Sequence, residues 1–209
     1  MQANLLSERL RGNGIRVKIF PWHNKSYIKQ IIQNFSSYGL RTKELVSSSL
    51  CISFLANYHE SLNSNCDVII FDRYKYTGIM KDVRKGIDFD LSFKNYLLAS
   101  EADYYFYLEI DPNIALKRIK SYRNISFYET GYQDTFNMKS IKTFEKFNKG
   151  EFSEEDIDRA FIKEKEKDLV FYSTYLKVVS NCIAIDATLS TDCISNYVYD
   201  YYKKRILCR

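Results

Sequence analysis

Glycine and proline are scarce in this chain of 209 residues, which contains seven glycines and two prolines. These residue types most often interrupt helices and strands, so their scarcity favours long helices joined by short connections. Long apolar runs are missing as well, because no stretch approaches the roughly 18 residues that a membrane-spanning helix needs. The sequence therefore predicts a globular protein with no membrane partner.

The cysteines lack any pairing pattern. They are odd in number and scattered, with no Cys-x-x-Cys motif, at Cys51, Cys66, Cys182, Cys193 and Cys208. This pattern argues against a disulfide framework or a zinc site and favours a reducing compartment. The first residues, which include Glu8, Arg9 and Arg11, are too polar for a signal peptide. We therefore expect a cytoplasmic location.

The chain also lacks a block of charge of one sign. Its formal net charge is +5, with lysines and arginines interspersed among acidic residues. Such a balance allows an anionic ligand and gives no reason to expect nucleic acid as a partner. The length suits one domain with a substantial core, so we predict a single domain over residues 1–209.

Strand patterns alternate with helical patterns along the chain. The first, at 15–20, alternates apolar and polar residues, which suits an edge strand, and the others are short apolar runs. The predicted strands cover residues 15–20, 67–71, 104–110 and 181–186. The predicted helices cover 2–12, 25–62 (as two helices), 94–102, 111–122, 139–179 (as one helix or a pair) and 190–206. Continuous apolar runs are typical of buried parallel strands. The alternation predicts an α/β fold with a parallel sheet.

The sharpest chemical signal is Asp72-Arg73-Tyr74, which follows the apolar run 67–71 directly. Ligands of open α/β sheets bind at the carboxyl ends of the strands. An arginine there can hold a phosphate with two parallel hydrogen bonds. The aspartate can hold a magnesium-bound water or orient the arginine. A structural ion pair at the strand end is the alternative interpretation.

Several motifs in register resemble the thymidylate kinase family of P-loop nucleoside monophosphate kinases. They are "FP" (20–21), "FLANYHE" (54–60), "DRYKYTG" (72–78), "YETG" (128–131) and "IDAT" (185–188), together with the strand-to-helix segment "YYFYLEIDPNIALKRI" (104–119). The opening residues resemble the helix that follows the family's phosphate-binding loop. The resemblance implies a three-layer P-loop-kinase-like fold, with helices on both faces of a parallel sheet. It also implies a lid at about 118–137 and a homodimer formed through the helix near 45–60.

In activity, the resemblance implies phosphoryl transfer from ATP to a pyrimidine deoxynucleotide, dTMP to dTDP, with Mg²⁺. Asp72 and Arg73 match the catalytic pair at the acceptor phosphate, and Asp72 is also the implied metal residue. Phe54 matches the aromatic residue that stacks on thymine, although a core phenylalanine would have the same helical spacing. The other implied substrate-binding residues are Lys25, Asn57, Tyr58, Tyr74, Gly78, Tyr128 and Glu129.

On the ATP side, the resemblance implies binding by Arg118, Arg123, Ala187 and Thr188. Arg118 matches an arginine near the donor adenine. Arg123 is either a lid arginine that stabilises charge on the transferring group or an ordinary solvated arginine. Tyr58 stands where the family has a base-reading arginine, and a phenol lacks the guanidinium fork. Base preference therefore stays open, and a related deoxynucleoside kinase is an alternative.

The phosphate-binding motif G-x-x-x-x-G-K-[ST] is absent from the sequence. Its backbone N–H groups and lysine hold the donor phosphates, so we predict that the chain as given is inactive. In the resembled sheet order 2-3-1-4-5, the first and central strand would be missing too. We favour an N-terminally shortened version of a complete kinase. The alternatives are a degenerate, non-catalytic nucleotide-binding or interaction protein, and a strand supplied by another chain.

Overall fold

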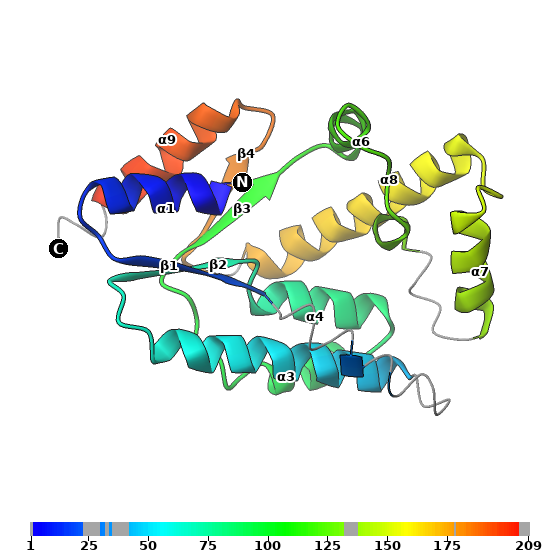
Figure 1. The fold of residues 1–209 in the computed structure, drawn as a ribbon, viewed down its shortest axis with the longest axis horizontal. Helices are drawn as coiled ribbons and strands as arrows, with labels where there is room; N and C mark the ends of the chain where they lie inside the picture. The colour runs from blue at the N-terminus through cyan, green and yellow to red at the C-terminus, as the bar shows by residue number, and fades with distance from the viewer. Residues whose placement is uncertain are drawn as a thin grey trace. The chain divides into compact units, whose positions relative to one another are not determined.

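Helices and strands alternate along the chain in the computed structural model, which describes residues 2–22, 30–31, 34, 42–131, 138–177 and 179–204 (Figure 1). The strands are β1 (Val17–Pro21), β2 (Val68–Asp72), β3 (Tyr105–Glu109) and β4 (Cys182–Asp186). The helices are α1 (Gln2–Gly12), α3 (Lys43–Leu62), α4 (Lys75–Arg84), α5 (Phe89–Asn95), α6 (Pro112–Lys120), α7 (Met138–Asn148), α8 (Glu154–Phe171) and α9 (Thr191–Tyr202). The structure also has two short helical turns, η1 (Phe127–Glu129) and η3 (Tyr172–Leu176). The prediction of a mixed α/β fold with parallel strands is confirmed.

The chain divides into two compact units. Unit 1 consists of residues 1–101 together with 189–209, and unit 2 consists of residues 102–188. Unit 1 is therefore built from two separate stretches of sequence, whereas unit 2 is continuous. The prediction of one domain over the whole chain stays a prediction.

Unit 1 is a parallel pair of strands between helices. β1 and β2 pair in register from Val17 opposite Val68 to Pro21 opposite Asp72. Helices α1 and α9 pack against each other on one side of the pair, and α3 and α4 lie on the other side (Figure 1). Leu10 of α1, Val17 and Tyr202 of α9 form a buried cluster. The predicted arrangement of helices on both faces of the sheet is thus present in this unit.

Unit 2 holds the second parallel pair. β3 and β4 pair from Tyr105 opposite Cys182 to Glu109 opposite Asp186. Helices α6 and α8 pack together around a buried cluster of Ala115, Ile125 and Phe161. Each of the two described sheets has two strands, β1 with β2 in unit 1 and β3 with β4 in unit 2.

Most predicted helices lie where the sequence placed them, with one clear error. The pattern over 94–102 predicted a helix, but α5 ends at Asn95 and residues 100–104 are irregular. The carbonyl oxygens of Ala99 and Ser100 accept hydrogen bonds from the Lys75 ammonium and the Tyr74 hydroxyl. Contacts distant in sequence thus replace the hydrogen bonds of a helix. Helix α4 was not predicted at all.

The first of the two helices predicted within 25–62, and part of the predicted lid, fall largely outside the described residues. In the described ranges, no helix has both the length and the apolar character needed to cross a membrane.

Candidate functional site

The carboxyl ends of β1 and β2 carry the predicted acceptor residues. Asp72 is the last residue of β2, and Arg73 follows it; both side chains are exposed. Neither side chain forms a hydrogen bond or ion pair with any residue that the structure describes. Within the described ranges, therefore, no ion pair holds this motif, and no described side chain neutralises either charge.

Arg73 has an unusual backbone. Its φ of 74° makes it the one non-glycine residue with a left-handed conformation in the described part of the chain. That conformation costs an L-residue roughly 1–2 kcal/mol. Strained residues of this kind cluster at functional sites, where the surrounding structure holds them in place. Here the strain bends the chain sharply between β2 and α4, directly at the candidate site.

An aromatic cluster lies beside this turn. Phe54 of α3 has ring centroids of Phe71, Tyr74 and Tyr96 within 5.2–6.1 Å of its own. Phe54 is 0% exposed, so its ring is a core residue in this structure. Stacking of Phe54 on a nucleobase stays a prediction, and it requires one of these neighbouring rings to move.

Two tyrosines, one in α3 and one at the start of α4, form hydrogen bonds with the segment after α5. The Tyr58 hydroxyl lies 2.9 Å from the Ser100 Oγ and accepts a hydrogen bond from the Ser100 N–H at 3.2 Å. The Tyr74 hydroxyl donates to the Ser100 carbonyl at 3.1 Å. Asn57 is engaged as well, because its Nδ2 donates to the carbonyl of Pro21 at 2.9 Å. These three predicted substrate residues therefore lie close together, and in this structure their side chains form hydrogen bonds with other residues of the candidate site.

A buried lysine strengthens the same segment. Lys75, the first residue of α4, is 3% exposed, and its Nζ lies 2.5 Å from the Glu101 carboxylate. It also donates to the carbonyl of Ala99 at 3.1 Å. A cation at a helix N-terminus is unfavourable, because the N–H groups there carry positive partial charge. Glu101 is what makes the burial of Lys75 tolerable.

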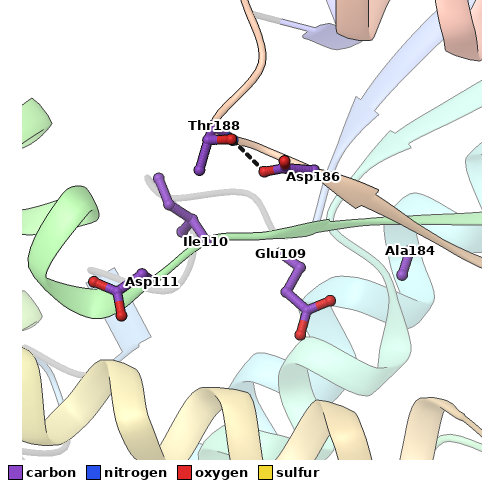
Figure 2. Close-up of a pocket in the computed structure, with 6 residues that line it drawn as sticks. All are labelled: Glu109, Ile110, Asp111, Ala184, Asp186 and Thr188. Carbon is purple, nitrogen blue, oxygen red and sulfur yellow. Dashed lines mark hydrogen bonds between the residues drawn. The ribbon is translucent and has the colours of Figure 1, made fainter.

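Unit 2 has a hollow at the carboxyl ends of its strands. Its volume is about 250 Å³, and it is lined by Glu109, Ile110, Asp111, Ala184, Asp186 and Thr188 (Figure 2). The Thr188 backbone N–H donates a hydrogen bond to the Asp186 carboxylate at 2.7 Å. A dashed line joins these two residues in Figure 2. Hydrogen bonds from Thr188 lower the pKa of Asp186, so this carboxylate stays charged.

Three of the predicted ATP-binding residues meet next to this hollow. The Arg118 guanidinium of α6 donates to the carbonyl of Ala187, and it donates to the carbonyl of Thr188 at 2.8 Å. The loop after β4 is thereby fastened to α6. Both bonds run from the rim of the guanidinium plane, and a planar ring can stack on the faces of such a group.

Arg123 and Glu129 form a clamp in the predicted lid. The two guanidinium nitrogens of Arg123 lie 2.8 and 2.7 Å from the two Glu129 oxygens. Glu129 also accepts hydrogen bonds from the Ser126 backbone N–H and hydroxyl at 2.9 and 2.7 Å. Arg123, first among these donors, lowers the pKa of Glu129 from its usual 4.5 to about 2. Both predicted residues are thus engaged with each other.

Two predicted residues lie wholly or partly outside the described part of the structure. Lys25 lies outside the described residues, and so does the side chain of Tyr128, although its backbone forms the middle of η1. Sequence reasoning missed Ser100, Glu101 and Ser126. The spacing Ser126-x-x-Glu129 is a capping-box signature and could have revealed the last of these. No local signal marks Ser100 or Glu101, since their partners are distant in sequence.

One exposed carboxylate at the site could take part in holding a metal ion. The described residues contain no group of three or more His, Cys, Asp or Glu side chains able to hold a metal ion. Mg²⁺ is commonly bound by one or two carboxylates together with substrate phosphates and waters. The exposed Asp72 fits that requirement, because no described residue occupies its oxygens.

Comparison with known proteins gives the family. The thymidylate kinase family model matches residues 1–168. The chain is 26% identical over 174 residues to "Probable thymidylate kinase 2" of Saccharolobus solfataricus, a match that covers 81% of this chain and 74% of that protein. It is 32% identical over 91 residues to "Thymidylate kinase" of Dictyostelium discoideum, covering 44% of this chain and 40% of that protein. This chain belongs to the thymidylate kinase family.

Proposed function

We propose that unit 1 binds a pyrimidine nucleoside monophosphate, dTMP in the first instance, as acceptor of the ATP γ-phosphoryl group. The observation that supports this most directly is the exposed Asp72–Arg73 pair at the carboxyl end of β2. No described residue neutralises either charge, so the guanidinium is available to the acceptor phosphate. The names of the two relatives support dTMP as the acceptor.

Catalysis in this proposal depends on position and charge. Arg73 would fix the acceptor phosphate, and Asp72 would hold water bound to Mg²⁺. The metal supplies neutralisation of phosphate charge when it is bound. Arg118, Ala187 and Thr188 would hold the adenine end of ATP. Arg123 would stabilise the transferring group only after release from Glu129, which now binds both ends of its guanidinium.

This proposal distinguishes nucleotide binding from phosphoryl transfer. The 209 residues contain no G-x-x-x-x-G-K-[ST] motif, so we expect this polypeptide by itself to bind nucleotide without phosphorylating it. The alternative of a non-catalytic nucleotide-binding protein has the same support. A coupled assay of ADP formation with dTMP and ATP tests this expectation, and turnover clearly above the blank contradicts it.

The acceptor site is tested by calorimetry. We expect Arg73→Ala to weaken dTMP binding about 10- to 100-fold, because a charge-assisted hydrogen bond is worth roughly 1.5–3 kcal/mol. Thymidine, which lacks the phosphate, should bind both proteins equally. Arg159→Ala, which removes a 68% exposed arginine from α8, is the control. Unchanged dTMP affinity in Arg73→Ala contradicts the assignment.

We also propose a homodimer formed through α3. Ile52 and Leu62 are 55% and 61% exposed, and with Leu55 they follow the spacing of one helix face. Sedimentation velocity tests this, with Ile52→Glu expected to shift the protein toward monomer.

The four described cysteines are free, which supports the proposal of a cytoplasmic location.

A further inference from the structure

Tyr96 fills a ring-shaped space beside the candidate site. It caps the end of α5 and is 1% exposed. Its ring centroid lies 5.5 Å from that of Phe54. On the side of α4, a Cβ added to Gly78 would lie 2.1 Å from the Tyr96 hydroxyl oxygen. The phenol therefore occupies the room that the missing side chain of Gly78 leaves open.

The hydroxyl of Tyr96 gains nothing from this position. It is fully buried and makes no hydrogen bond within the described structure. Burying a hydroxyl without a partner is costly, and phenylalanine would fill the same space without that cost. Burial first, and the nearby Asp82 carboxylate second, raise the pKa of Tyr96, so the phenol stays neutral.

A second unpaired oxygen lies in the same interior. Asp82 is 1% exposed; its Oδ2 accepts a hydrogen bond from the Ser92 hydroxyl at 2.8 Å, while its Oδ1 has no partner among the described residues. Asp82 follows Gly78 by one helical turn on α4, and Ser92 precedes Tyr96 by one turn on α5. Residues four apart share a helix face. The hydrogen bond between Asp82 and Ser92 and the contact between Gly78 and Tyr96 therefore lie one helical turn apart, both between α4 and α5.

We propose that Tyr96 occupies a cryptic pocket for the pyrimidine base, and that its ring leaves the space between Phe54 and Gly78 when the nucleotide binds. This inference rests on the proposed function, because Phe54 and Gly78 are two of the implied substrate residues. A pyrimidine and a phenol are both planar six-membered rings with polar edges. The imide N–H of thymine or uracil is a donor suited to the unpaired Oδ1 of Asp82.

The unpaired hydroxyl lowers the free-energy cost of the exchange. When Tyr96 leaves, its hydroxyl regains hydrogen bonds to water, which offsets part of the apolar contact that it gives up. The observed nucleotide affinity then equals the intrinsic affinity multiplied by the fraction of molecules with the pocket open. A change that stabilises the ring in its buried position must therefore weaken nucleotide binding.

Two substitutions of Tyr96 should act in opposite directions. Tyr96→Phe removes the unpaired hydroxyl, so it should raise the melting temperature and weaken dTMP binding about 5- to 100-fold. Tyr96→Ala removes the ring, so it should lower the melting temperature and bind dTMP at least as tightly as the wild type. Tyr202→Phe, at a 7% exposed tyrosine of α9, is the control and should leave dTMP affinity unchanged.

The pocket itself is tested with p-cresol, the side chain of tyrosine as a free molecule. Tyr96→Ala should bind p-cresol and regain melting temperature with it, whereas the wild type should do neither. Equal p-cresol binding by both proteins, or unchanged dTMP affinity in Tyr96→Phe, overturns the inference. Should the wild type bind no dTMP, the proposed function fails. The pocket is then judged by p-cresol alone, and absence of p-cresol binding to Tyr96→Ala overturns it.

Discussion

Replacement of Arg73 by glycine should make the protein more stable and its phosphate binding weaker. The left-handed φ of 74° costs arginine roughly 1–2 kcal/mol, and glycine adopts it without strain. Glycine loses more conformational freedom on folding, which returns roughly 0.5–1 kcal/mol of that gain. The net expectation is an increase of about 0.5–1 kcal/mol in the free energy of unfolding.

Arg73→Ala separates the two effects. Alanine keeps the backbone strain and removes the guanidinium, which has no described partner, so its stability should stay within about 0.5 kcal/mol of the wild type. Both variants should lose the same dTMP affinity, since both lack the guanidinium. Stability and binding thus change independently across this series.

Urea unfolding followed by tryptophan fluorescence is the assay. Trp22, the single tryptophan, is 3% exposed, and its backbone N–H donates to the Asp72 carbonyl at 3.2 Å, so it reports on this end of the sheet. The midpoint should rise for Arg73→Gly at an unchanged slope. A glycine variant less stable than the alanine variant would refute the argument from strain.

Three further predictions test other contacts. Glu129→Gln should lower the free energy of unfolding by about 1–2 kcal/mol at pH 7, an amount already reduced for solvent screening at the half-exposed Arg123. Because the folded-state pKa of Glu129 is lowered to about 2, this loss should persist above pH 4.5 and vanish as the pH falls toward 2. Unfolding curves measured across this pH range check the expectation. Glu101→Leu should lower the stability more than Lys75→Met does, because Glu101→Leu leaves a 3% exposed ammonium without its carboxylate, whereas Lys75→Met leaves a carboxylate that is 48% exposed to water. Equal losses in denaturant midpoint would contradict this. Gly78→Ala should cost about 1–3 kcal/mol through its clash with Tyr96, and less in a Tyr96→Ala background, a coupling that a double-mutant cycle measures.

The strands and one helix start could be predicted from local sequence. β1 follows an alternation of apolar and polar residues, and the other strands are short apolar runs. Asp111 caps α6 through hydrogen bonds from the N–H groups of Asn113 and Ile114 at 2.8 and 3.2 Å. Helix α4 could not be predicted, because it buries Lys75 and Asp82, whose partners Glu101 and Ser92 lie 26 and 10 residues away. A local pattern treats such residues as exposed.

Some features of the candidate site could likewise be predicted from the local sequence, and others could not. Asp72 and Arg73 follow an apolar strand directly, so their position at its carboxyl end was predictable. The engagement of Tyr58 with Ser100, 42 residues away, was not. The burial of Phe54 also depends on rings from β2 and from the end of α5, which no periodicity in α3 reveals.

The two-part construction of unit 1 has a consequence for folding during synthesis. Helix α9 supplies Tyr202 to the cluster with Leu10 and Val17, and Gln2 donates to the Thr191 carbonyl at 3.1 Å. These contacts form only after the roughly 190 residues between the end of α1 and the end of α9 have been synthesised, whereas unit 2 is one continuous stretch. At roughly 5–20 residues per second, the apolar face of α1 waits about ten seconds or more for its partner. During that interval the nascent chain exposes a surface that chaperones would recognise.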